Sequence, residues 1–322
     1  MSDTTTIHDV VPKVNVVRRA VGLGAEIRNV RLSDELSDEV IHAINDLLLE
    51  HKVLFFRDQQ ELDAAEHERL AMRLDDLVPD HQVGIAKAMP SILKPVSVRS
   101  GGRADQRQQT VIMLEGYPKI CHLRRVINPS YYGDTVWSDM ATAYQALPLS
   151  LRMFADQLWA VHNNSQGYAM KAELAEADKQ HLDDVFTRPS FETEHPVVSV
   201  HPKTGKRSLA SGDFVQRFVG FQKYTSQKIL RLFQSYITAP ENTVRWSWQP
   251  GDVAIWDCPA IQYHEAQDFD DHHRVQNRAT TDRDLPLNID ARRCTKQVNT
   301  PKQRSPKTRT AYGAMRSRSS PW

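Results

Sequence analysis

The stretch that decides the fold reads TVRWSWQPGDVAIWD and covers residues 243–257. Branched and aromatic residues fill both of its halves, and Pro250-Gly251 lies between them. Such residues favour β-strands, whereas a Pro-Gly pair marks a turn. We therefore predict two strands, at residues 243–248 and 252–256, that form a hairpin around this turn.

The rest of the chain repeats this pattern of short apolar runs between turn residues, and helices interrupt it. Further strands are predicted at residues 53–56, 120–126 and 135–137, and a second hairpin at 196–201 and 206–209. Apolar residues at helical spacing predict a helix that begins within residues 33–36, and others at 64–77, 140–147, 149–159 and 226–236. Together they predict a mainly β fold with helical insertions (α+β), a sandwich or jelly roll.

The composition is that of a globular chain of 322 residues, with 40% apolar residues, 25% charged residues and a net charge of +1. This balance argues against binding to nucleic acid or to an anionic membrane. No apolar run approaches the ~20 residues of a membrane span, and residues 1–6 lack the pattern of a signal peptide. The three cysteines are odd in number and far apart, so we expect no disulfide framework and a cytoplasmic location.

We divide the chain into three parts, the last of which is marked by its charge. We expect a flexible N-terminus at residues 1–13 and one domain at residues 14–290. Residues 291–322 contain nine Lys or Arg and no acidic residue. Such a block is typical of a disordered, solvated tail, and less often of a specific binding arm.

Five motifs point to one family. They read HKVLFFR at 51–57, GDTVW at 133–137, TEHPVV at 193–198, HPKTG at 201–205 and GDVAIWD at 251–257. Together they resemble the TauD/TfdA family of iron(II)- and 2-oxoglutarate-dependent dioxygenases, and in particular its alkylsulfatases and sulfonate dioxygenases. The resemblance covers residues 14–289. It implies a double-stranded β-helix, which is a jelly roll, whose open end holds the iron.

The family's metal ligands are replaced in this chain. RQQTV at 107–111 aligns with the family strand that carries His-x-Asp, which puts Gln108 at the histidine and Thr110 at the carboxylate. In the family, the third metal ligand is a distal histidine that lies eleven residues before the arginine that binds 2-oxoglutarate. If Arg274 is that arginine, Tyr263 occupies the position of this histidine. Amide and hydroxyl groups are poor substitutes for the imidazoles and carboxylate that bind iron(II). We therefore predict that no stoichiometric iron(II) binds.

Two alternatives would rebuild a metal site. A one-residue deletion in the loop at 265–273 would bring His264 to the distal position, although such a slip turns a strand side chain to the other face. His122 and Cys121, on a neighbouring predicted strand, could instead form a relocated site.

The anion-binding positions of the family are retained. The resemblance implies that Thr135 and Arg274 bind the distal carboxylate of 2-oxoglutarate, and that His81 and Arg278 bind a substrate sulfonate or sulfate. Val111 belongs to the same group of binding residues. Arginine suits these anions because its planar fork donates two parallel hydrogen bonds. We expect a small carboxylate, sulfonate or sulfate ester as the ligand, with 2-oxoglutarate as a second one.

Three functions fit this sequence. The first is an iron-dependent dioxygenase that uses a rearranged metal site. The second is an iron-independent enzyme in which Tyr263 or His264 performs acid–base chemistry, with the arginines stabilising a tyrosinate. The third is a pseudoenzyme, in a homo-oligomer or paired with an active paralogue. The replaced ligands favour the second and third, and the sequence does not choose between them.

Overall fold

The computed structural model describes residues 10–11, 15–76, 92–93, 117–127, 133–163, 191–212, 215–265, 275–280, 283–284, 286–293 and 295–298. Its helices are α2 (Asp38–His51), α3 (Ala64–Asp76), α4 (Met140–Ala146), α5 (Leu149–Asp156), α8 (Lys223–Ile237) and the 3-10 helix η2 (Pro240–Asn242). Its strands are β1 (Val16–Arg18), β2 (Ala25–Ile27), β3 (Val53–Phe56), β4 (Ile92–Leu93), β5 (Tyr117–Pro118), β6 (Ile120–Ile127), β7 (Thr135–Asp139), β8 (Trp159–Asn163), β9 (Phe191–Pro196), β10 (Val198–Val200), β11 (Arg207–Leu209), β12 (Val215–Phe218), β13 (Thr243–Trp246), β14 (Val253–Asp257), β15 (Ile261–Glu265), β16 (Val275–Thr280), β17 (Arg283–Asp284) and β18 (Thr295–Val298).

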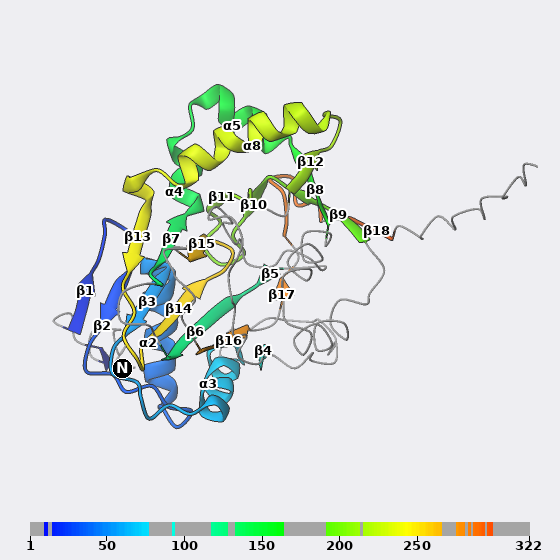
Figure 1. Ribbon diagram of the computed structural model, residues 1–322. Helices are drawn as coiled ribbons and strands as arrows, with labels where there is room; N and C mark the ends of the chain where they lie inside the picture. The colour runs from blue at the N-terminus through cyan, green and yellow to red at the C-terminus, as the bar shows by residue number, and fades with distance from the viewer. Residues whose placement is uncertain are drawn as a thin grey trace, which may run out of the picture.

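The strands form one large sheet and four smaller ones (Figure 1). The large sheet has the order β1-β2-β3-β14-β6-β16-β4, and the smaller ones are β13-β7-β15, β12-β8-β9-β18, β10-β11 and β17-β5. The pairings among the described strands are antiparallel except that of β2 with β3. This arrangement agrees with the predicted jelly roll with helical insertions.

Alternate residues of β3 and β14 face two different cores, because successive side chains of a strand point to opposite faces. Leu54 and Ile255 pack with residues of α2 and α3 in the first core. Phe55 and Trp256 pack with residues of β13, β7 and β15, such as Trp137, in the second. The large sheet therefore lies between two helices on one side and the three-stranded sheet β13-β7-β15 on the other. We call the second core the interior of the roll.

The hairpin predicted around Pro250-Gly251 is wrong. Strand β13 pairs with β7 in the three-stranded sheet, whereas β14 pairs with β3 and β6 in the large sheet. The turn therefore carries the chain from one sheet to the other. The tryptophans on both sides of the turn, Trp246, Trp248 and Trp256, bury their rings in the shared interior. Burial of this apolar surface favours the crossover. The second predicted hairpin is confirmed as β10-β11.

Several predicted boundaries also differ. Helix α2 begins at Asp38 instead of within residues 33–36, and α5 ends at Asp156 because Trp159 starts β8. Val11 is buried in the first core although it lies in the expected flexible N-terminus. Strand β18 pairs with β9 although it lies in the expected tail. Ordered contacts thus reach beyond residues 14–290 at both ends.

The structure joins Cys121 and Cys258 in a disulfide, with a Cα–Cα distance of 6.0 Å across 137 residues of sequence. The number and spacing of the cysteines predicted no disulfide framework, so this single disulfide corrects that expectation. Cys121 lies opposite Trp256 in the β6–β14 pair, and Cys258 follows two residues later. The sheet pairing brings the two thiols together, and their spacing in the sequence gives no sign of it.

A third core lies under helices α4, α5 and α8. These helices contribute buried residues that pack with residues of β8, β10, β11 and β12. In Figure 1, α5 and α8 lie across the end of the molecule farthest from α3. No helix in the described parts of the chain has the length and apolar character to cross a membrane.

Candidate functional site

Two of the predicted site residues, Thr135 and Tyr263, lie on the sheet β13-β7-β15. In the antiparallel pair β15–β7, Tyr263 lies opposite Trp137, and Glu265 lies opposite Thr135. Residues opposite each other share a face, as do residues two apart on one strand. Thr135, Trp137 and Tyr263 therefore all face the interior of the roll, and all three are buried.

The neighbouring candidate His264 lies on the other face of β15. It is opposite Val136, and both side chains are partly exposed. The ring of Tyr263 instead packs against Trp256, with 5.0 Å between the ring centroids. The structure thus brings Tyr263, and not His264, into the interior of the roll.

The turn after β13 supplies a partner for Thr135. The indole Nε1 of Trp248 donates a hydrogen bond of 2.8 Å to Thr135 Oγ1. The guanidinium of Arg125 lies 4.9 Å from the centroid of the same tryptophan ring, and it donates to the carbonyl of Gly133 at 3.1 Å. Arg125 is fully buried. It therefore brings a permanent positive charge into the interior, against the indole that contacts Thr135.

Arg125 is a candidate binding residue that sequence reasoning missed. A signal for it was present in the predicted strand at 120–126. Alternation along that strand places Cys121, Leu123 and Arg125 on one face, and only the third carries a charge. Charged residues are rarely buried without a partner or a function.

The far end of β7 is anchored by a buried ion pair. The ammonium of Lys52 lies 2.6 Å from Asp139 Oδ2 and donates to the carbonyl of Gly22 at 3.0 Å. The second carboxylate oxygen of Asp139 accepts from two backbone N–H groups in the first turn of α4. This network holds β7, and with it Thr135, in register against the end of α2.

The other predicted site residues are placed only in part. Five of them fall outside the described residues: His81, Gln108, Thr110, Val111 and Arg274. Arg278 lies on β16, where its register partners are Leu123 on one side and Leu93 on the other.

The relocated metal site does not form from the residues proposed for it. Cys121 is bonded to Cys258. His122 faces the opposite side of β6, where its ring centroid lies 5.7 Å from that of His67 on α3. In the part of the chain that the structure describes, no group of three His, Cys, Asp or Glu residues could hold a metal ion.

Comparison with known proteins decides the family. Residues 15–280 match the model of the taurine catabolism dioxygenase TauD, TfdA family. The chain belongs to the TauD/TfdA family. Among solved structures, a taurine dioxygenase from Burkholderia xenovorans superposes with a TM-score of 0.71 at 29% identity. The match covers 88% of this chain and 95% of that one. The predicted TauD-like fold is thereby confirmed.

Two relatives of this TauD/TfdA chain are more similar in sequence. It is 42% identical over 278 residues to an alkylsulfatase of Acinetobacter baylyi. This match covers 86% of this chain and 87% of the relative. It is also 41% identical over 269 residues to an alpha-ketoglutarate-dependent sulfate ester dioxygenase of Pseudomonas putida. That match covers 83% of this chain and 89% of the relative. Both relatives are named for sulfate-ester chemistry.

Four histidines of this TauD/TfdA chain form two buried pairs. His67 and His122 lie between α3 and the large sheet, and the ring centroids of His162 and His195 are 4.9 Å apart on β8 and β9. Burial, with Arg124 nearby, lowers the pKa of His67 from 6.5 to about 4, and burial lowers the pKa of His195 to about 4. Burial and the neighbouring histidine lower the pKa values of His122 and His162 well below 6.5.

These pairs predict a loss of stability in mild acid. Because the folded-state pKa is depressed, the unfolded chain binds more protons below pH 6.5, so the free energy of unfolding falls between about pH 6.5 and pH 4. A shift from 6.5 to about 4 corresponds to roughly 3 kcal/mol for His67. Urea unfolding at pH 7.5, 6 and 5 measures the slope, and His67→Gln should reduce it. The exposed His42→Gln serves as the control. A free energy of unfolding that is unchanged between pH 7.5 and 5 would contradict this reading.

Proposed function

We propose that this chain binds a small sulfate ester or sulfonate together with 2-oxoglutarate in the roll, and that it does so without stoichiometric iron(II). The observation that carries the metal part is the place of Tyr263. The residue aligned with the distal histidine faces the interior of the roll, and the only adjacent histidine, His264, faces away.

The ligand class is supported by the relatives. The two proteins at 41% and 42% identity are named an alkylsulfatase and a sulfate ester dioxygenase, and the second name includes alpha-ketoglutarate, which is 2-oxoglutarate. The retained Thr135, Arg274 and Arg278 suit two anionic groups. The buried guanidinium of Arg125 adds positive charge to the same interior.

The residues at the metal positions do not suit iron(II). A facial site for this ion needs two imidazoles and a carboxylate, which offsets part of the ion's charge. This chain offers an amide at Gln108, a hydroxyl at Thr110 and a phenol at Tyr263. The relatives do not support a loss of iron, so this part of the proposal rests on the three replaced residues and on the direction of Tyr263.

Without the metal, two uses of the roll remain open. Tyr263 could transfer a proton to or from a bound anion, and a nearby arginine would stabilise the tyrosinate. His264 can take this role only if the strand shifts by one residue, because it faces away. In the other use the chain binds its ligand without turning it over, as a pseudoenzyme or as a partner of an active paralogue.

A second candidate function has specific support. Identity above 40% over more than four-fifths of the chain links it to two proteins named for enzymatic activities. An iron-dependent dioxygenase with a rearranged metal site is therefore the alternative proposal.

Metal analysis and 2-oxoglutarate binding on one sample separate these functions. We expect protein that is purified anaerobically and supplied with iron(II) to retain less than roughly one-tenth of an equivalent after desalting. The same sample should still bind 2-oxoglutarate in calorimetry. One retained equivalent, with O₂ consumption that depends on 2-oxoglutarate, would establish the dioxygenase instead. Turnover of a sulfate ester without metal would separate the iron-independent enzyme from the pseudoenzyme.

A further inference from the structure

The hydroxyl group of Thr135 accepts one hydrogen bond in the structure and donates none. It accepts from the indole Nε1 of Trp248 at 2.8 Å. A threonine hydroxyl also carries one proton that it can donate. Among the residues that the structure describes, none accepts this proton. Thr135 is fully buried and faces the interior of the roll, where a donor without an acceptor is costly. An acceptor on a ligand would satisfy it.

Trp248 determines the direction in which Thr135 donates. An indole Nε1–H can donate a hydrogen bond but cannot accept one. It must therefore occupy a lone pair of Thr135 Oγ1, and the hydroxyl proton has to point away from the indole. The hydroxyl is thus oriented as a donor before a ligand arrives. Such preorganisation reduces the entropy cost of binding.

The indole ring of Trp248 is held on its faces as well as at its Nε1. The guanidinium of Arg125 lies 4.9 Å from the centroid of the ring, and the ring centroid of Trp137 lies 6.1 Å from it. Arg125 also donates to the carbonyl of Gly133 at 3.1 Å, two residues before Thr135. These contacts join β6, the start of β7 and the turn after β13. A rotation of the indole would break them.

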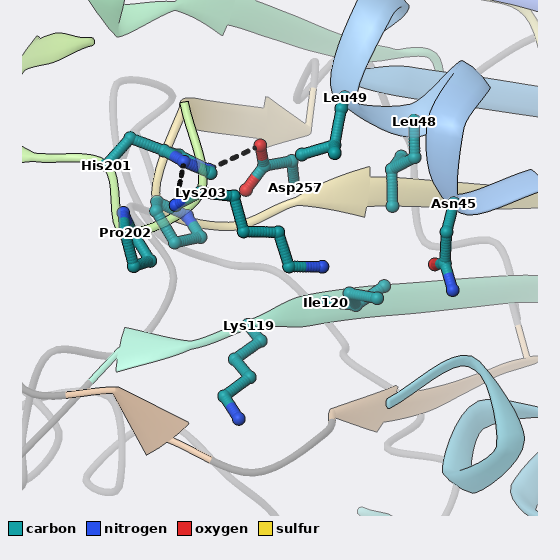
Figure 2. Close-up of a pocket in the computed structure, with 10 residues that line it drawn as sticks. Asn45, Leu48, Leu49, Lys119, Ile120, His201, Pro202, Lys203 and Asp257 are labelled. Carbon is teal, nitrogen blue, oxygen red and sulfur yellow. Dashed lines mark hydrogen bonds and ion pairs between the residues drawn. The ribbon is translucent and has the colours of Figure 1, made fainter. Parts of the chain in front are cut away.

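The turn that carries Trp248 is fixed, because β14 is anchored at both ends. Just before its start, Oδ2 of the buried Asp252 accepts a hydrogen bond of 2.8 Å from the backbone N–H of Gln249. At its end, Nε2 of His201 lies 2.8 Å from Oδ2 of Asp257, and Figure 2 shows these two side chains directed toward each other. The fold therefore sets the position of the indole without help from a ligand.

We infer that Trp248 is a positioning residue for 2-oxoglutarate. Its hydrogen bond to Thr135 Oγ1 directs the threonine proton toward the interior of the roll, where the distal carboxylate of 2-oxoglutarate accepts it. Hydrogen bonds to an ionised carboxylate are roughly twice as strong as those between neutral groups, so the direction of this proton affects the affinity. The inference rests on the proposed function, because it takes Thr135 as a residue that binds 2-oxoglutarate.

Calorimetric titration of the full chain with 2-oxoglutarate tests this role. Trp248→Phe keeps an aromatic ring but removes the N–H, and we expect it to weaken binding about fivefold. Thr135→Val removes the hydroxyl itself and should weaken binding about thirtyfold. In the double variant, Trp248→Phe should cause no further loss, because the hydroxyl through which it acts is gone. Thr135→Ser keeps a hydroxyl and should retain the sensitivity to Trp248→Phe.

Trp137→Phe is the matched control. The chemical change is the same, and the ring packs against Trp248. In the described part of the chain, however, the indole Nε1 of Trp137 has no hydrogen-bond partner to lose. We expect this variant to lower the melting temperature and to leave the affinity for 2-oxoglutarate unchanged. If Trp248 contributed packing alone, the two variants would have equal effects on binding.

The possible failures are distinguishable. If the parent binds 2-oxoglutarate and Trp248→Phe binds it equally well, the inference is wrong and the proposed function stands. Losses that add in the double variant have the same meaning, because Trp248 would then act independently of Thr135. A parent that does not bind 2-oxoglutarate would overturn both. If Trp248→Phe does not fold, the nitrogen–proton correlation spectrum of the parent decides. The indole N–H signal of Trp248 should shift when 2-oxoglutarate binds, and an unmoved signal would refute the role.

Discussion

A variant that carries Gln108→His, Thr110→Asp and Tyr263→His should bind about one equivalent of iron(II), whereas the parent chain retains almost none. It should also decarboxylate 2-oxoglutarate in the presence of O₂, which we expect to be undetectable in the parent. The substitutions place two imidazoles and one carboxylate at the three positions that we predict to correspond to the family's metal ligands. Metal analysis after anaerobic desalting and release of CO₂ from labelled 2-oxoglutarate are the two measurements.

The double variant Gln108→His, Thr110→Asp is the matched control. It keeps His264, which faces away from the interior, and Tyr263, which faces into it. We expect it to bind iron(II) far more weakly than the triple variant. If the two variants bind equally, His264 completes the site and the assignment of faces on β15 does not hold in solution. Because Tyr263→His also shortens a buried side chain beside Trp256, the melting temperature of each variant must be recorded.

Arg274→Ala should abolish detectable binding of 2-oxoglutarate. Without iron(II) to chelate the keto acid, the affinity depends on the contacts that hold the distal carboxylate. Loss of one partner of a buried charged pair costs about 2–5 kcal/mol, which corresponds to a decrease of roughly 30-fold to several thousand-fold. A parent affinity in the range expected for a single carboxylate anchor would then fall below the limit of calorimetry.

The control for this prediction is Arg231→Ala. Arg231 lies on α8 and is exposed, so its removal changes the net charge by the same amount without touching the roll. Equal binding of 2-oxoglutarate in the parent and in Arg274→Ala would show that the anion lies elsewhere. Arg125→Gln should be measured beside them, because a large loss there would identify the buried guanidinium as the anchor instead.

The local sequence predicted most elements of the fold. The β-branched and aromatic residues of β3, β6 and β14 favour strands wherever they occur, and the apolar positions of α2 and α3 recur at helical spacing. These properties depend on residues close together in the chain. The family motifs added the jelly roll, which the comparison with solved structures bears out.

The pairing of those strands could not be read in the same way. Pro250-Gly251 predicts a turn in any fold, but whether the flanking strands pair or separate depends on where Trp246 and Trp256 find apolar partners. The disulfide between Cys121 and Cys258 depends likewise on β6 lying beside β14. Both features are set by contacts between distant parts of the chain.

The sequence by itself gave the prediction that Gln108, Thr110 and Tyr263 stand at the positions of the family's metal ligands. Only the tertiary structure decided that Tyr263 faces the interior while His264 faces away, that His122 points to α3, and that Arg125 is buried against Trp248. The reason is geometric. Neighbouring residues on a strand point to opposite faces, so the direction of each side chain is known only once the strand has its partners.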